Sequence, residues 1–180
     1  MKSRAKIWIF SFFAFCLGHV LVNAQERGAD KVRLSPNASV SQTIGTTIVS
    51  VTYGRPSLKG RSMSALAPAD KVWRTGANES AAITFSSGVE FGGQHVEVGT
   101  YSLYTIPSDT HWTFILNSTL SWGTRYDEAM DVVRATGDVS EGNSVESFTI
   151  GFDTLSADKA DLVLSWGNLS VAVPITVSSE

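Results

Sequence analysis

Short runs in which apolar and polar residues alternate, separated by turns that contain glycine or proline, constrain the fold of this chain more than any other feature. A period of two sends successive side chains to opposite faces of a strand, so each run predicts a half-buried β-strand. The runs lie at 38–44, 46–53, 81–86, 89–91, 94–96, 100–106, 112–117, 145–153, 162–166 and 169–177. No stretch has the apolar spacing of a long amphipathic helix. The pattern predicts an all-β fold, an antiparallel β-sandwich of two sheets, jelly-roll-like or barrel-like, with about nine to ten strands.

Glycines between these runs predict how the strands connect. Gly45 separates the first two runs, and Gly92-Gly93 separates two later ones. Glycine tolerates the positive φ angles that tight hairpin turns require. Gly167-Asn168 has the composition of a two-residue turn as well. We therefore expect hairpins at all three positions.

Two regions lack clear alternation. The loop 55–79 contains two prolines, Pro56 and Pro68. It is predicted to be a connection with one helical turn at 62–66. Between 121 and 144 the spacing is mixed. We expect a loop through Trp122 and Tyr126, an edge strand from about Asp131, and a polar loop over 138–144.

The N-terminal residues have the pattern of a secretory signal. Lys2, Arg4 and Lys6 precede an apolar run at 7–22, and a small residue stands at Ala24. This order of a basic start, a short apolar run and a small-x-small site is typical of signal peptides, and the run is short for a bilayer span. We expect cleavage after Ala24 and a periplasmic or secreted protein.

The expected mature chain has three further properties. Residues 25–36 are polar and are predicted to form a flexible leader, and 37–178 has the length of a single domain. The only cysteine, Cys16, lies within the predicted signal, so no disulfide is expected and the core alone must stabilise the fold. No transmembrane segment is expected once the signal is removed.

Charge is distributed unevenly along the expected mature chain. It has 11 basic and 17 acidic residues, a net charge of −6, which argues against nucleic acid as a partner. Before Asn78 the loop 55–79 contains a single acid, Asp70. Five of the 11 basic residues lie in this loop: Arg55, Lys59, Arg61, Lys71 and Arg74. The pattern predicts one positive region on a negative body.

This basic loop is the candidate functional site. Guanidinium groups match the geometry of carboxylate, sulfate and phosphate, and aromatic walls are typical of small-molecule sites. We therefore predict a binding module for a small anionic or carbohydrate-like ligand. The candidate ligand-binding residues are Arg55, Lys59, Arg61, Trp73, Arg74, Asn78, Glu79, Tyr101, Tyr104 and Trp122.

Two other interpretations of the same loop stay open. In one, the protein is a hydrolase or lyase in which Glu79 is the general acid or base, although no second carboxylate has a fixed spacing to it. In the other, the loop is a structural clasp, because long loops are uncommon unless they function or are tied down. There Trp73 and Val72 fill one end of the core, Arg74 pairs with acids, and Glu79 pairs with Arg74 or Arg55.

Motifs for metals and common cofactors do not occur. His95 and His111 are the two histidines of the expected mature chain, and neither has metal-ligand spacing to another His or Cys. The nucleophile-elbow motif and the glycine-rich phosphate-binding motifs do not occur either. We expect no metal and no cofactor, and the sequence makes no prediction of oligomeric state.

Several segments carry a family resemblance. These are Y-G-R-P at 53–56, K-G-R at 59–61, V-W-R-T-G-A-N-E at 72–79 and G-T-Y-S-L-Y-T-I-P at 99–107. In these segments, and over about 35–177, the chain resembles the domain-of-unknown-function 2911 family of exported bacterial proteins. The resemblance implies an export signal and a compact β-rich domain. It implies no established activity and no catalytic residues.

Overall fold

The computed structural model describes residues 27–28 and 31–178, and the predicted signal peptide, 1–24, lies outside them. Within the described residues the fold is nearly all β, as predicted, with nine strands and two short 3-10 helices. The elements are β1 (Asn37–Ile44), β2 (Thr47–Gly54), η1 (Met63–Ala65), β3 (Ala81–Phe85), β4 (Val89–Phe91), β5 (Gln94–Val96), β6 (Gly99–Ile106), β7 (His111–Asn117), η2 (Glu128–Met130), β8 (Asp131–Asp153) and β9 (Lys159–Thr176).

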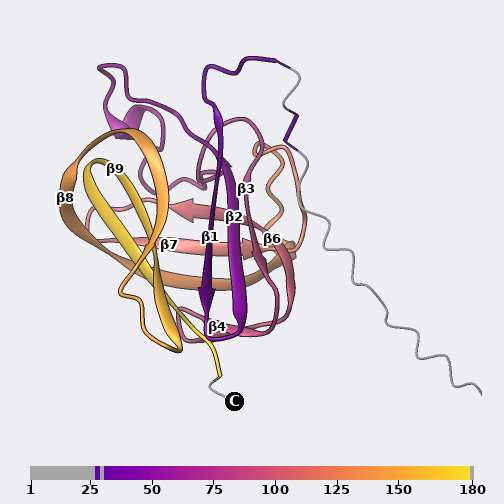
Figure 1. The fold of residues 1–180 in the computed structure, drawn as a ribbon. Coiled ribbons are helices and arrows are strands. Elements are labelled where there is room, and N and C mark those ends of the chain that lie inside the picture. The colour runs from indigo at the N-terminus through magenta and orange to yellow at the C-terminus, as the bar shows by residue number, and fades with distance from the viewer. Residues whose placement is uncertain (1–26, 29–30, 179–180) are drawn as a thin grey trace, which may run out of the picture.

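The strands form one antiparallel sheet in the order β1-β2-β3-β6-β7-β8-β9-β4-β5, where the pattern predicted two sheets. The sheet is folded into a sandwich-like shape and is not a closed barrel. β8 and β9 are long and curve around one side of the molecule, as Figure 1 shows. The Tyr53 hydroxyl on β2 accepts a hydrogen bond from the Ile150 N–H on β8, at 3.0 Å. Strands far apart in the sheet order therefore face each other across the core.

Three predictions near the C-terminal end were wrong. Residues 138–144 are not a loop but part of β8, and the strand from Asp131 is not an edge, because β8 pairs with both β7 and β9. Gly167 and Asn168 lie inside β9 and close no hairpin. Gly167 has a φ of +58° opposite a register shift in β8. A glycine with positive φ serves a β-bulge as well as a turn.

The other two predicted hairpins are confirmed. Ile44 pairs with Thr47 across a turn in which Gly45 has a φ of +56°. Phe91 pairs with Gln94 across Gly92 and Gly93, whose φ angles are +57° and +78°. Two positive φ angles in succession match the type I′ turn that suits the twist of a hairpin. The expected helical turn is η1.

Trp73 fastens the loop 55–79 to the core of the sandwich. Its ring stacks on Trp166 of β9, with centroids 5.4 Å apart and an interplanar angle of 10°. It also makes edge contacts with Phe148 of β8 at 4.9 Å and with Trp112 of β7 at 6.2 Å. Its backbone exchanges two hydrogen bonds with Thr105. The expectation that Trp73 fills the core is confirmed, since only 7% of the residue is exposed. The same expectation for Val72 was wrong, because the next side chain of an extended segment points the opposite way and Val72 is 38% exposed.

Three connections meet at one end of the sandwich, opposite the end where β9 finishes, as Figure 1 shows. We call this the loop end, and it comprises residues 31–36, the loop 55–79 and the β7–β8 connection 118–127. Asn78 Nδ2 donates to the Ser35 carbonyl at 3.3 Å. The backbones of Glu79 and Trp122 form an isolated antiparallel bridge. These contacts place segments that are distant in the sequence side by side.

Candidate functional site

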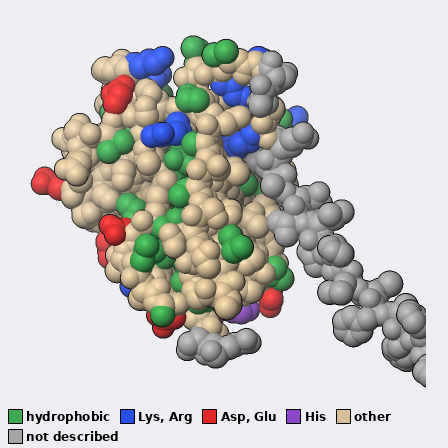
Figure 2. Space-filling model, in the orientation of Figure 1, with side chains coloured by type: hydrophobic (Ala, Val, Ile, Leu, Met, Phe, Trp, Pro, Cys, Tyr) green, Lys and Arg blue, Asp and Glu red, His purple; other side chains and the backbone are tan. Residues whose placement is uncertain are grey.

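The loop end carries the concentration of basic side chains that the sequence predicted. Figure 2 shows Lys and Arg side chains gathered at the upper end of the visible face, with one acidic side chain beside them at the upper left, whereas the other acidic side chains lie at its sides and lower end. The candidate residues on this loop differ in what their charges contact. Those contacts decide which of them remain available to a ligand.

Arg55 is used within the fold. Its Nε donates to the Phe148 carbonyl at 3.0 Å, and its Nη2 donates to Thr149 Oγ1 at 2.7 Å. Both acceptors lie on β8. The guanidinium therefore fixes the start of the loop to the facing layer of the sandwich, as the clasp interpretation expects.

Arg61 and Lys59 shape the loop locally. Arg61 donates from Nε to the Leu58 carbonyl at 2.9 Å and from Nη2 to the Ser57 carbonyl at 2.8 Å. Lys59 has a φ of +50°, and its backbone N–H donates to Glu146 Oε1 at 2.6 Å. Both residues are exposed.

Glu79 is buried in a clamp of two arginines. Arg33 donates to both carboxylate oxygens, at 2.7 and 3.0 Å, and Arg27 Nη1 lies 3.4 Å from Oε2. The Glu79 side chain is only 5% exposed. Arg27 also donates to the carbonyls of Glu79 and Ser80. The sequence suggested Arg74 or Arg55 as the partner of Glu79; instead both partners come from the segment that was expected to be a flexible leader.

The clamp sets the ionisation of its members. Burial favours the neutral acid and would raise the pKa of Glu79, but the hydrogen bond from Arg33 and the charges of both arginines outweigh it and hold that pKa below its usual value. Burial also lowers the pKa of the Arg27 guanidinium to about 10, despite the attraction of Glu79. Glu79 and Arg27 are therefore both charged at neutral pH.

An open cleft of about 570 Å³ lies beside the clamp. Trp122, which is 61% exposed, forms one wall. The lining residues are Gly28, Lys31, Val32, Arg33, Leu34, Asn78, Glu79 and Trp122. The cleft thus brings three of the candidate residues together with a lysine and an arginine of the N-terminal segment.

A second, smaller cavity of about 160 Å³ lies under the loop, and we call it the arginine pocket. Two indole rings, Trp73 and Trp166, contribute to its walls, together with the side chains of Arg61 and Arg74. Its lining residues are Ser35, Pro56, Arg61, Leu66, Trp73, Arg74, Gly76, Ala77 and Trp166. Three candidate residues, Arg61, Trp73 and Arg74, therefore share one cavity.

Of the two arginines that line this pocket, Arg74 has a donor without an acceptor in the described part of the chain, whereas Arg61 donates two hydrogen bonds. The Nε of Arg74 is buried and has no hydrogen-bond acceptor among the described residues. A Cβ added to Gly123 would lie 2.1 Å from Arg74 Cδ, so the bare glycine makes room for the arginine stem. The clasp interpretation expected Arg74 to pair with acids, and the ion pairs within the described part of the chain do not include it.

The remaining aromatic candidates line neither cavity. The hydroxyl of Tyr104 forms a 2.7 Å hydrogen bond with Ser121 Oγ, and its ring contacts Tyr126 at 5.1 Å. The Tyr101 hydroxyl donates to the Glu97 carbonyl at 3.0 Å. Burial, followed by the Glu97 charge, raises the pKa of Tyr101. Tyr104 supports the β7–β8 connection from within, whereas Tyr101 contacts a different turn.

Sequence reasoning missed residues that complete the two cavities. Arg33 and Lys31 lie in a polar stretch with no periodic signal, and Trp166 stands in a run that was read only as a strand. Within residues 27–28 and 31–178, no three His, Cys, Asp or Glu side chains lie close enough to hold a metal ion. No helix of the described chain is long and apolar enough to cross a membrane.

The fold and the site together define an all-β, sandwich-like protein with a basic, tryptophan-lined pocket at one end of its sheet. A family model described as "Protein of unknown function (DUF2911)" matches residues 35–175, and the chain belongs to this family. The match confirms the resemblance seen in the sequence. Neither the search of curated proteins nor the search of solved structures found a match.

Proposed function

We propose that this protein is an exported binding module that takes a small anionic ligand in the arginine pocket. The observation that carries the proposal is Arg74, a charged side chain whose buried Nε has no acceptor among the described residues. Buried donors are nearly always paired in native proteins, so one without an acceptor calls for an explanation. Arg74 lines the arginine pocket, so an oxyanion bound there lies beside this guanidinium and can supply acceptors to it.

The chemistry of the pocket favours a carboxylate, sulfate or phosphate group. Arginine presents its donors in a planar fork that matches such oxyanions, and Arg61 lines the same cavity. The volume of about 160 Å³ suits one anionic group and a short attachment rather than a whole drug-sized molecule. An acidic sugar bound through its charged group is one ligand of this kind, since indole walls suit the flat face of a ring.

Catalysis by Glu79 is less well supported than binding. A general acid needs a raised pKa, whereas the pKa of Glu79 is held below its usual value. Its two oxygens are also occupied by Arg33. Glu79 therefore serves better as an anchor for the N-terminal segment than as a proton donor.

The structural clasp is the second candidate function, and Arg55 is the observation that favours it. Its two hydrogen bonds to β8 support this function, because they connect the start of the loop to the sheet. The two functions are compatible, because Arg55 and Trp73 hold the loop in place and thereby position Arg74 and Arg61.

Isothermal titration with sulfate, phosphate, acetate and glucuronate, against glucose as a neutral control, tests the proposal. We expect binding of at least one oxyanion, with a rise in melting temperature equivalent to about 2.7 kcal/mol at a hundredfold excess over Kd. Arg74→Gln should abolish it. Arg125→Gln removes an exposed arginine from the β7–β8 connection and should leave it unchanged. Binding that survives Arg74→Gln, or no binding of any oxyanion, would refute the proposal.

A further inference from the structure

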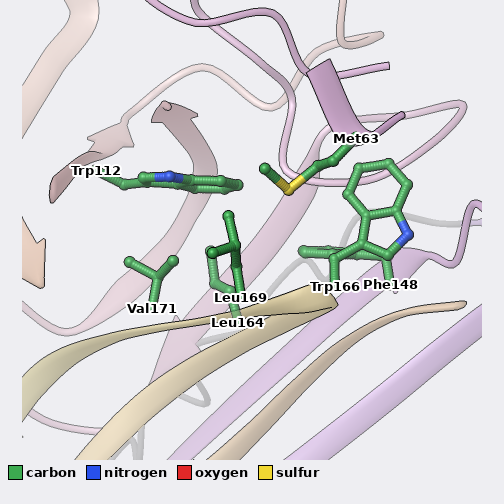
Figure 3. Close-up of a pocket in the computed structure, with 7 residues that line it drawn as sticks. All are labelled: Met63, Trp112, Phe148, Leu164, Trp166, Leu169 and Val171. Carbon is green, nitrogen blue, oxygen red and sulfur yellow. The ribbon is translucent and has the colours of Figure 1, made fainter. Parts of the chain in front are cut away.

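An apolar crevice lies under η1 beside the arginine pocket. Its walls are entirely hydrophobic and include Met63, Trp112, Phe148, Leu164 and Trp166. Figure 3 shows the Met63 side chain entering from η1, with its sulfur between the rings of Trp112 and Trp166. With Met63 in this position the crevice has no room for a water molecule. Met63 therefore fills it as a plug.

The crevice and the arginine pocket share their walls. Trp166 lines both, and it stacks on Trp73 of the arginine pocket. The segment over them is also shared, because Met63 closes the crevice and Leu66, the C-cap of η1, lines the pocket. The Trp166 ring is therefore shared by the arginine pocket, which two arginines line, and the crevice, which has no charged lining residue.

The plug belongs to a short helix at the surface. η1 has no buried residue, and Met63 is only partly covered. Methionine is unbranched and has three rotatable side-chain bonds, so it adapts easily to a different neighbour. An apolar group of a ligand can therefore take the place of its side chain in the crevice.

A buried polar group in the crevice also has no partner. Trp112 is 2% exposed, and its indole N–H has no acceptor among the described residues. The other indole that lines the crevice, Trp166, already donates its N–H to the Glu146 carbonyl at 3.3 Å. A ligand with a carbonyl, ether or hydroxyl oxygen along its apolar part would supply the acceptor.

We infer that the ligand of the arginine pocket is amphiphilic: an anion whose acyl or aryl tail displaces Met63 and occupies the crevice against Trp112 and Trp166. This inference rests on the proposed function, because Arg74 and Arg61 hold the head group. The class comprises medium-chain carboxylic acids and aromatic acids. Short inorganic anions use the head-group site alone.

Titration calorimetry with acetate, butyrate, hexanoate and octanoate, each below its micelle concentration, tests the inference. We expect Kd to fall by about fourfold for each methylene group that is buried. Met63→Ala should tighten octanoate binding and leave acetate binding unchanged. Met63→Trp, which fills the crevice, should weaken octanoate binding alone. Ser64→Ala, the exposed neighbour on η1, is the matched control and should change neither.

The outcomes separate the two proposals. If acetate and octanoate bind equally and both are lost in Arg74→Gln, the amphiphilic ligand is refuted and the anion site stands. If octanol binds as tightly as octanoate and does not respond to Arg74→Gln, the crevice accepts apolar ligands without an anion, and the inference is overturned. If no carboxylate or inorganic oxyanion binds in an Arg74-dependent way, both proposals fail.

Discussion

Truncation of Trp73 to alanine tests how the loop 55–79 is held on the sheet. The ring is buried among three aromatic partners, and the residue is 7% exposed. Burying about 150–250 Å² of aromatic surface at about 25 cal/mol per Å² is worth roughly 4–6 kcal/mol. Measured truncations of buried aromatic residues cost about 3–5 kcal/mol, because the surroundings partly relax. We therefore expect Trp73→Ala to lose about 3–5 kcal/mol of unfolding free energy.

Urea denaturation followed by far-UV circular dichroism measures this loss without relying on tryptophan fluorescence. For a domain of about 150 residues the same loss lowers the melting temperature by roughly 6–20 °C. Trp122→Ala is the control, because that indole is 61% exposed and its removal should change the free energy by less than about 1 kcal/mol. A loss below about 1 kcal/mol for Trp73→Ala, at an unchanged m-value, would refute the view that this ring anchors the loop.

Two further predictions concern the buried clamp and the close approach of two backbones. Since the folded pKa of Glu79 is lowered, its contribution to stability is fully present above the unfolded pKa of about 4.3 and is lost as the pH falls through the lower folded value. Glu79→Gln should thus lower the free energy of unfolding by about 3 kcal/mol at pH 7, and its difference from wild type should become smaller below about pH 4. Urea denaturation at both pH values measures this difference, and an equal difference at the two would contradict the prediction. A Cβ at Gly54 would lie 2.3 Å from the Ala77 carbonyl oxygen, so Gly54→Ala should destabilise by about 1–3 kcal/mol. Gly151→Ala, where a Cβ meets nothing within 4 Å, should be near neutral in the same thermal melts, and equal effects of the two substitutions would rule out the backbone contact as the cause.

The strands that sequence predicted well are those with one buried and one exposed face. In β2, the odd-numbered residues are buried and the even-numbered ones are more exposed, up to Tyr53, which gives a clear period of two. Residues 140–144 of β8 are all exposed, and the pairing with β9 shifts register between Glu141 and Val145. Because neither face is buried there, apolar and polar residues do not alternate in the sequence. This part of the strand therefore has the composition of a polar loop.

The site was predictable only where its parts are near in sequence. Arg61, Trp73 and Arg74 stand in one loop, and they do share a cavity. The partner of Glu79 is Arg33, 46 residues earlier in a polar stretch. An ion pair over that separation produces no pattern in the sequence. Only the fold shows that the Glu79 carboxylate already binds Arg33.

The attachment of β4 and β5 to the rest of the sheet determines when folding can finish. Their hairpin joins the sheet through β9, where Phe91 pairs with Ile175 and Glu90 pairs with Thr176. Synthesis runs from the N-terminus, so the hairpin leaves the ribosome about 80 residues before the strand that receives it. During that interval Phe91, which is fully buried in the finished fold, lacks Ile175, its partner on β9. The complete sheet can therefore form only after β9 has been synthesised through residue 176.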